Sequence, residues 1–161
     1  YEGHAAESEI GASHVYRVDP RSGTCAIAAD DFVRPNGLAF SPDERRLYVS
    51  DTGMTHFPDG PRHIRAFDVG ADGALSGGEV FATCTEGIFD GFRFDAEGRL
   101  WTSAGDGVHC YDPDGTLLGK VLVPEAVANV VFGGPKRNRM FICATTSLYS
   151  VMLGVRGATR P

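Results

Sequence analysis

The sequence lacks the patterns that mark several common enzyme classes. Its four cysteines are widely spaced and form no Cys-x-x-Cys pair, which argues against a zinc-type cluster. The five histidines form no His-Glu-x-x-His arrangement, and there is no Gly-x-Ser-x-Gly elbow, phosphate-binding loop or dinucleotide fingerprint. These classes are therefore disfavoured. Cys110 and Cys143 lie in apolar, strand-like runs, and we expect both to be small core residues.

Long apolar runs and strong basic clusters are also missing. No apolar run approaches the roughly 18 residues of a membrane-spanning helix, and nothing at the start resembles a signal peptide. The formal net charge is -6, and the nearest basic clusters, residues 45–46 and 136–139, lie in predicted hairpin turns. We therefore expect neither a nucleic-acid nor a membrane partner. Because the sequence opens at Tyr1 without an initiator Met, we expect residues upstream of it, and localisation stays open.

Helical periodicity is scarce, and only residues 4–12 and 124–131 could form a turn or two. Two segments, residues 34–51 and 90–103, instead share one plan. Each begins with an oxygen-bearing side chain and a glycine, continues as an alternation that ends in Phe, and then has a turn and a second short apolar run. Asn36 opens this plan in the first segment and Asp90 in the second. Each segment predicts a strand, a turn and a strand.

A weaker third copy of this plan covers residues 128–143. The three copies align on Phe40, Phe94 and Phe132. In this alignment Ala128 takes the place of Asn36 and Asp90, and Asn129 is one residue out of register. Because a shift of one residue turns a strand side chain to the opposite face, we expect Asn129 not to point where Asn36 and Asp90 point.

Between these segments, alternating strands run into turns rich in Asp, Pro and Gly. They cover residues 15–23, 64–73 and 108–115, and a fourth begins at 147–151. A repeat of about 40 to 55 residues with roughly four short strands is typical of propeller blades. We predict an all-β fold of about three to four blades. Since a closed propeller has at least about four blades, we expect residues 1–161 to form one incomplete propeller domain, completed by missing N-terminal blades or by another chain.

The ordered series of motifs resembles one known family. The motifs are residues 1–4, 34–44, 89–95, 101–108 and 132–135. Together they are similar to the family of gluconolactonase, senescence marker protein (regucalcin) and luciferin-regenerating enzyme, and most of all to its bacterial gluconolactonases. The resemblance implies that this chain is the C-terminal part of a six-bladed β-propeller, which would carry one divalent metal ion on its central axis.

The resemblance also implies a metal site. Asn36 matches the Asn of the family's Pro/Ser-Asn-Gly-Leu motif, and Asp90 matches the Asp of its Asp-Gly-hydrophobic motif, so both are expected to be metal ligands. A ligand Glu and a substrate-contacting Asn would lie upstream of Tyr1. Amide and carboxylate oxygens are hard ligands, which favours calcium, with magnesium, manganese or zinc as alternatives. Without the resemblance, Asn-Gly and Asp-Gly are more simply turn dipeptides.

The function implied by the resemblance is a metal-dependent hydrolase that opens sugar lactones, with Asp90 also acting as the general base. A sugar lactone would be its small-molecule partner, and this chain alone would be inactive without the missing ligands. Two alternatives stay open. One is an esterase or phosphotriesterase-type hydrolase on the same scaffold, similar to diisopropyl fluorophosphatase. The other is a non-enzymatic propeller that binds calcium or a partner protein.

The remaining polar and aromatic residues have simpler interpretations. We expect a turn-forming role for Asp51, surface positions for His4 and His14, and strand-face packing for Phe94 and Trp101. The connection over residues 52–62, which contains Phe57, Pro58 and Gly60, is the best candidate for a pocket-lining loop, because propeller connections vary where function is carried.

Overall fold

The structure is a computed structural model that describes residues 8–159, and these residues form thirteen β-strands and no α-helix. The strands are β1 (Ser13–Val18), β2 (Cys25–Phe32), β3 (Pro35–Phe40), β4 (Arg46–Asp51), β5 (His63–Val69), β6 (Leu75–Thr83), β7 (Phe92–Phe94), β8 (Leu100–Ala104), β9 (Gly107–Tyr111), β10 (Leu117–Leu122), β11 (Val127–Gly133), β12 (Arg139–Ala144) and β13 (Leu148–Met152). One short 3₁₀ turn, η1 (Gly53–Thr55), follows β4. No helix among the described residues has the length and apolar character needed to cross a membrane.

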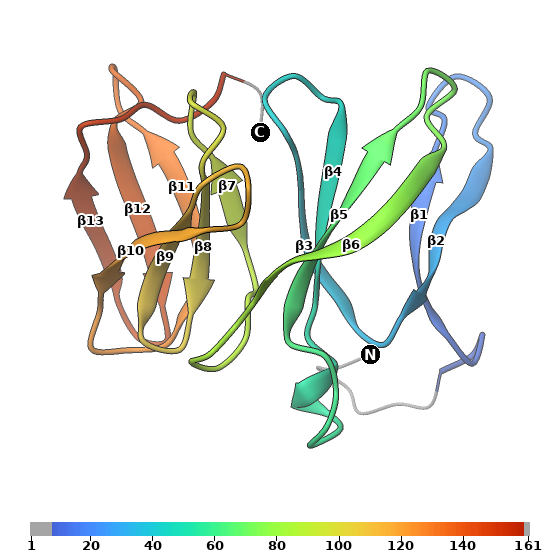
Figure 1. The fold of residues 1–161 in the computed structure, drawn as a ribbon, viewed down its shortest axis with the longest axis horizontal. Helices are drawn as coiled ribbons and strands as arrows, with labels where there is room; N and C mark the ends of the chain where they lie inside the picture. The colour runs from blue at the N-terminus through green and yellow to red at the C-terminus, as the bar shows by residue number, and fades with distance from the viewer. Residues whose placement is uncertain (1–7, 160–161) are drawn as a thin grey trace.

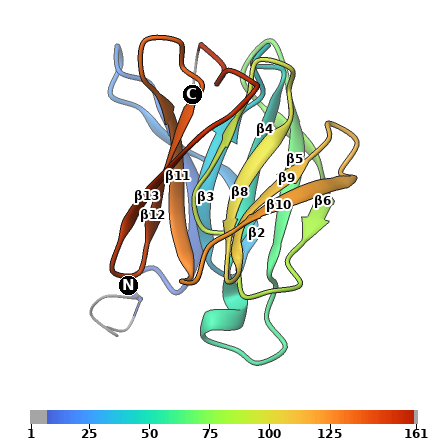
Figure 2. The ribbon, with the colours of Figure 1, turned by 90° about the vertical axis from the view of Figure 1, so that its left-hand side faces the viewer.

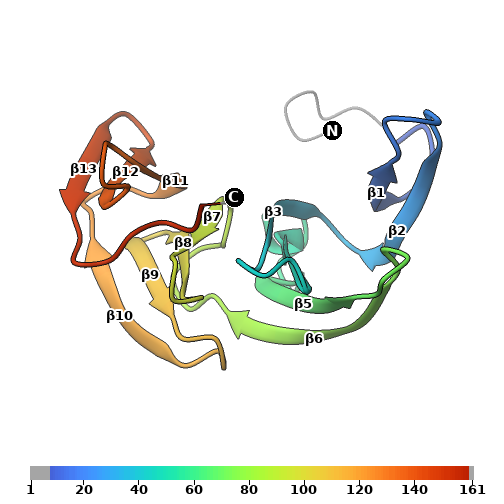
Figure 3. The same ribbon diagram turned by 90° about the horizontal axis from the view of Figure 1, so that it is seen from above.

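The strands form four antiparallel sheets that follow one another along an arc (Figures 1 and 3). The two middle sheets have four strands each, β3 to β6 and β7 to β10, and they lie between the two-stranded β1–β2 sheet and the three-stranded β11–β13 sheet. Figure 2, seen from the side of β13, shows the β11–β13 sheet in front of the others. This arrangement confirms the predicted all-β fold of three to four propeller blades. The segment 124–131 forms no helix and leads into β11 instead.

The core lies between neighbouring sheets, because the central strands bury both of their faces. In β4, Leu47 and Val49 pack against Val15 and Phe32 of the first sheet. Tyr48, which points the opposite way as strand alternation requires, packs edge-on against Phe94 of the next sheet, with ring centroids 4.9 Å apart. Full burial of each such side chain stabilises the fold by about 1.5–3 kcal/mol. The sheets are therefore held face to face by apolar side chains.

In each of the last three sheets, the first strand lies on the inner side of the arc (Figure 3). β3, β7 and β11 run in the same direction, from the lower end of the molecule in Figure 1 to the upper end, and β7 contacts both β3 and β11. The beginnings of these three strands therefore lie on the same side of the arc, which is the lower side in Figure 1. Residues 153–159 run across the upper side in Figure 1. There the Ala158 N–H donates to the Phe94 carbonyl oxygen at 3.0 Å.

Candidate functional site

The structure brings the backbones of the two oxygen-bearing motifs together. Asn36 and Gly37 lie at the beginning of β3, and Asp90 and Gly91 lie directly before β7. A Cβ atom at Gly37 would overlap the carbonyl oxygen of Asp90 and lie 3.3 Å from the Gly91 Cα atom. Only glycine allows this approach, because the neighbouring atoms belong to a backbone that cannot rotate away. Asn36 is exposed and Asp90 is half-buried, so both side chains have access to solvent.

Two buried serines hold these motifs in place. Ser50 Oγ, at the end of β4, lies 3.3 Å from the carbonyl oxygen of Gly37 and 3.4 Å from that of Asp90. The Asp90 N–H donates to Ser103 Oγ, at the equivalent place in β8, at 2.9 Å. Both serines are fully buried, where an unpaired polar group is costly. Sequence reasoning missed them, although a Ser ends the second apolar run in both copies of the plan.

Asp51 fixes the segment that leads into Asn36. Its carboxylate is 3% exposed and accepts backbone N–H bonds from Val33 at 2.8 Å, Arg34 at 2.8 Å and Gly53 at 3.1 Å. The predicted turn-forming role of Asp51 is therefore confirmed. Hydrogen bonds from backbone N–H groups to a carboxylate are charge-assisted and stronger than neutral ones, so Asp51 ties the start of β3 to the end of β4.

The third copy of the plan departs from a regular strand. The Gly91 N–H donates to the Ala128 carbonyl oxygen at 2.8 Å, so this copy adjoins the Asp90 motif from the other side. A register shift lies between Val127 and Asn129, and the first copy has one at the equivalent place, between Pro35 and Leu38. The Asn129 side chain lies against Gly91, the residue that follows Asp90, and the expectation that it points elsewhere than Asn36 and Asp90 stays a prediction.

A charged cluster occupies the β8–β9 turn. Asp106 binds His109 Nε2 at 2.6 Å and Lys120 Nζ at 2.7 Å. Partial burial opposes ionisation of Asp106, but the hydrogen bonds from Lys120 and His109 lower its pKa below the ordinary value. His109 is buried and meets Phe89 edge-on with ring centroids 6.1 Å apart. This cluster therefore supports the segment directly before Asp90.

The loop over residues 52–62 lies on the lower side of the molecule in Figure 1, as does the beginning of β3. It is closed by a hydrogen bond from the Met54 N–H to the Pro61 carbonyl oxygen at 3.0 Å, and Phe57 is 52% exposed near its tip. His63, the first residue of β5, has its pKa lowered by burial, which the charge of Asp51 partly opposes. A pocket-lining role for this loop stays a prediction.

The donor chemistry near β3 and β7 suits a hard cation. Within residues 8–159, no three His, Cys, Asp or Glu side chains are placed to hold a metal ion together. The Asn36 amide oxygen and the Asp90 carboxylate are oxygen donors of the kind that calcium, magnesium and manganese prefer, whereas zinc sites more often use Cys or His. These two residues therefore fit a hard metal in chemistry, but they supply only part of the roughly 6 to 8 oxygens that calcium binds.

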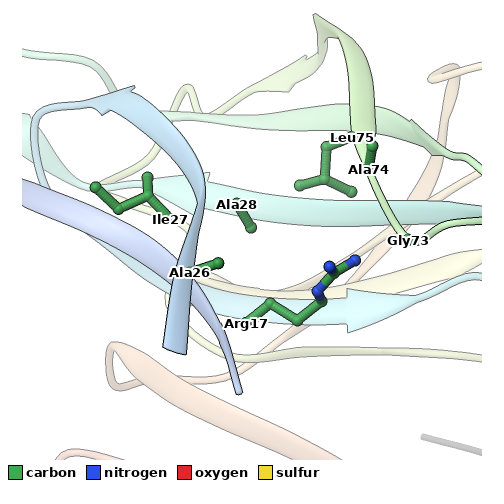
Figure 4. Close-up of a pocket in the computed structure, with 7 residues that line it drawn as sticks. All are labelled: Arg17, Ala26, Ile27, Ala28, Gly73, Ala74 and Leu75. Atoms are coloured by element: carbon green, nitrogen blue, oxygen red, sulfur yellow. The ribbon is translucent and has the colours of Figure 1, made fainter. Parts of the chain in front are cut away.

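A cavity of about 230 Å³ lies elsewhere, between the β1–β2 hairpin and the β5–β6 turn (Figure 4). It is lined by Arg17, Ala26, Ile27, Ala28, Gly73, Ala74 and Leu75. Arg17 donates from Nη1 to the Asp72 carbonyl oxygen at 2.8 Å, and the other lining residues are apolar. Among the described residues that line it, none is a carboxylate or a histidine.

Other predictions have mixed outcomes. The predicted packing roles are confirmed for Phe94, which is buried against Tyr48, and for Trp101, which stacks edge-on against Phe132 and donates to Asp95. Cys110 is buried as expected, but the prediction for Cys143 is wrong, because its side chain is exposed on the face of β12 opposite to the buried Met140 and Ile142. His14 is half-buried rather than fully exposed. His4 and the motif over residues 1–4 lie outside the described residues.

Comparison with known proteins identifies the family. The family model described as the SMP-30/Gluconolactonase/LRE-like region matches residues 2–146. The chain belongs to this family. The resemblance in the motifs around Asn36 and Asp90 is thereby confirmed.

Similar proteins include several named as lactonases. The chain is 30% identical to the lactonohydrolase OryH of Aspergillus oryzae, over 89% of this chain and 34% of that protein. It is 32% identical to the pentonolactonase XacC of Haloferax volcanii, over 84% of this chain and 46% of that protein.

A solved structure described as a gluconolactonase from Xanthomonas campestris has a TM-score of 0.82 and 40% identity, covering 92% of this chain and 47% of that one. A regucalcin from Agrobacterium tumefaciens, described as a calcium-binding protein, has a TM-score of 0.70 and 27% identity, covering 91% of this chain and 54% of that one. The chain thus spans between about a third and a half of the length of its relatives.

Proposed function

We propose that this chain is part of a metal-dependent lactonase that opens sugar lactones, with further blades or another chain closing the ring. The observation that carries the proposal is the contact between Gly37 and the Asp90 backbone, since it places the Asn-Gly and Asp-Gly motifs side by side. The names of the lactonase relatives support the substrate class, and the calcium-binding regucalcin supports a divalent cation.

In this proposal Asn36 and Asp90 hold the metal through their side-chain oxygens. A bound divalent cation would polarise the lactone carbonyl and lower the pKa of water. The Asp90 carboxylate accepts the proton of the attacking water as general base, and its position is maintained by the Ser103 hydroxyl and by Ser50. Asn36 is a neutral ligand and therefore leaves the net positive charge of the ion available to the substrate.

The test is made on the full-length protein, stripped of metal with a chelator and then given back calcium. We expect lactone hydrolysis, followed as acid release in a pH-stat, to be lost and then restored. Asp90→Ala should abolish measurable turnover, a loss of at least about 10²-fold as expected when a general base is removed. Asn36→Ala should chiefly raise the metal Kd. Asn138→Ala, in the β11–β12 turn, is the matched control. Full metal-dependent hydrolysis by Asp90→Ala would refute the proposal.

A further inference from the structure

Asn129 lies at a bulge in β11. β11 pairs with β12 through Val127 with Ala144 and Asn129 with Cys143, so two steps along β11 match one step along β12. Such a bulge re-aims the side chains that follow it and is frequent beside active sites. Here the Asn129 amide lies on the side of Gly91 where a Cβ atom would stand, and the three atoms nearest to that point all belong to this amide.

The corresponding contact one blade earlier is made by a backbone and not by a side chain. The position over Gly37 is filled by the Asp90 carbonyl group, whereas the position over Gly91 is filled by the Asn129 side chain. The glycine of each motif therefore receives a polar group from the following blade. Gly91 directly follows Asp90 in the sequence, so the Asn129 amide lies against the residue next to the proposed catalytic one.

The two ends of this amide have different partners. Asn129 Oδ1 accepts the Val130 N–H at 2.9 Å, so the oxygen is engaged by the backbone. Among residues 8–159, Asn129 Nδ2 has no hydrogen-bond partner, and the residue is exposed. An amide NH₂ group offers two donors and no lone pair for a cation. Asn129 Nδ2 is therefore suited to donate to an oxygen of a ligand and cannot itself bind the metal.

We propose that Asn129 Nδ2 donates a hydrogen bond to a ring hydroxyl of the sugar lactone, which makes Asn129 a specificity-determining residue. This inference rests on the proposed lactonase function. A site that hydrogen-bonds a substrate hydroxyl discriminates against an analogue that lacks it, because the donor of the protein is then left unpaired. Asn129 would thus select hydroxylated lactones over plain aliphatic ones.

The experiment compares two lactones in the full-length protein with calcium. Glucono-1,5-lactone carries ring hydroxyls, and δ-valerolactone has the same ring size without them. We expect Asn129→Ala to lower kcat/KM for gluconolactone by about tenfold, mainly through KM, and to change kcat/KM for δ-valerolactone by less than about twofold. Asn129→Asp keeps an oxygen for the Val130 N–H but removes the donor, so it should lose the same preference.

Calcium titration supplies the readout that separates this role from a structural one. The calcium Kd of Asn129→Ala should stay within about twofold of the wild-type value, because the amide nitrogen is not a ligand. Asn138→Ala, at the far end of the same hairpin where Asn138 donates to the Leu153 carbonyl oxygen at 3.2 Å, should leave the preference between the two lactones unchanged.

Three results would overturn the inference. The first is an equal loss of activity on both lactones in the Asn129 variants, and the second is a weakened calcium Kd in Asn129→Ala. The third is a wild-type preference that Asn129→Ala retains. Each of these leaves the lactonase proposal standing if the wild-type protein opens either lactone. A wild-type protein that opens neither lactone defeats the lactonase proposal, and the role of Asn129 fails with it.

Discussion

Replacing Asp51 by Asn tests the link between a buried carboxylate and the proposed metal site. The carboxylate accepts three backbone N–H bonds, from Val33 through Oδ2 and from Arg34 and Gly53 through Oδ1. Asn has nearly the same shape but only one acceptor oxygen. If that oxygen keeps Arg34 and Gly53, the new NH₂ group faces the Val33 N–H, and two donors oppose each other.

The expected destabilisation follows from this count. One N–H group left without an acceptor costs about 1–3 kcal/mol, and the two surviving bonds lose their charge assistance at a further cost of about 0.5–1 kcal/mol each. The total is about 3 kcal/mol, which is a large part of the roughly 5–15 kcal/mol by which proteins are stable. For a protein of this size, 1 kcal/mol shifts Tm by about 2–4 °C, so we expect Tm to fall by about 6–12 °C.

The same change should also affect the proposed metal site and the titration of a neighbouring histidine. Asp51 fixes the residues directly before Asn36, so calcium affinity should fall even below the new Tm, where the protein is folded. The Asp51 charge raises the pKa of His63 against the larger lowering effect of burial. Its removal should therefore lower the pKa of His63 further, which an NMR titration of the imidazole protons can follow.

Asp68→Asn is the matched control for Asp51→Asn. Asp68 lies on β5 of the same sheet, and its side chain is 74% exposed in a 3.5 Å ion pair with Arg46. Exposed pairs contribute about 0–1 kcal/mol, so this variant should keep the wild-type Tm within a few degrees. The reasoning is wrong if Asp51→Asn is within about 0.5 kcal/mol of the wild type and binds calcium equally well.

Two further changes test the packing around the site. Hydrogen bonds from Ser147 and Tyr149 lower the pKa of Glu125 to about 2, below its ordinary value of 4.5; because the folded-state pKa is the lower one, this stabilisation is present above pH 4.5 and is lost as the pH falls toward 2. Glu125→Gln should therefore flatten acid unfolding, followed by circular dichroism, within that window, and an unchanged profile contradicts this. Gly37→Ala should lower both Tm and calcium affinity, since its Cβ atom would overlap the Asp90 carbonyl oxygen. A wild-type Tm and calcium Kd would show that residue 37 does not lie against the Asp90 backbone.

Much of the fold could be predicted from the sequence, because its signals are local. The alternation in residues 64–69 predicts a strand, and the structure has β5 at His63–Val69. The turns rich in Asp, Pro and Gly set the blade spacing in the same local way. The two positions Asn36 and Asp90 also stand out without any structure, since a repeated plan places an amide in one copy and a carboxylate in the other.

The contacts between blades could not be predicted in this way. The approach of Gly37 to Asp90 and the bridging of both motifs by Ser50 join residues that are distant along the chain. Cys143 occupies an apolar run like that of Cys110, but it lies on the face of β12 opposite to the buried Met140 and Ile142 and is exposed. Burial of this kind depends on which sheet covers which face, and strand alternation does not contain that information.

The sequence by itself thus determined the strands, the blade repeat and the places of Asn36 and Asp90, the two residues of the proposed site. Only the tertiary structure decided how their neighbours meet, and Asn129 shows the reason. The repeat predicts only that its side chain does not share the direction of Asn36 and Asp90, and the structure places it, beside a bulge in β11, against Gly91 of the adjoining blade. A bulge is stable where the adjoining blade has room for the displaced side chain, and that room exists because residue 91 is a glycine. This fit between two blades is a property of their packing, which no single segment of the sequence specifies.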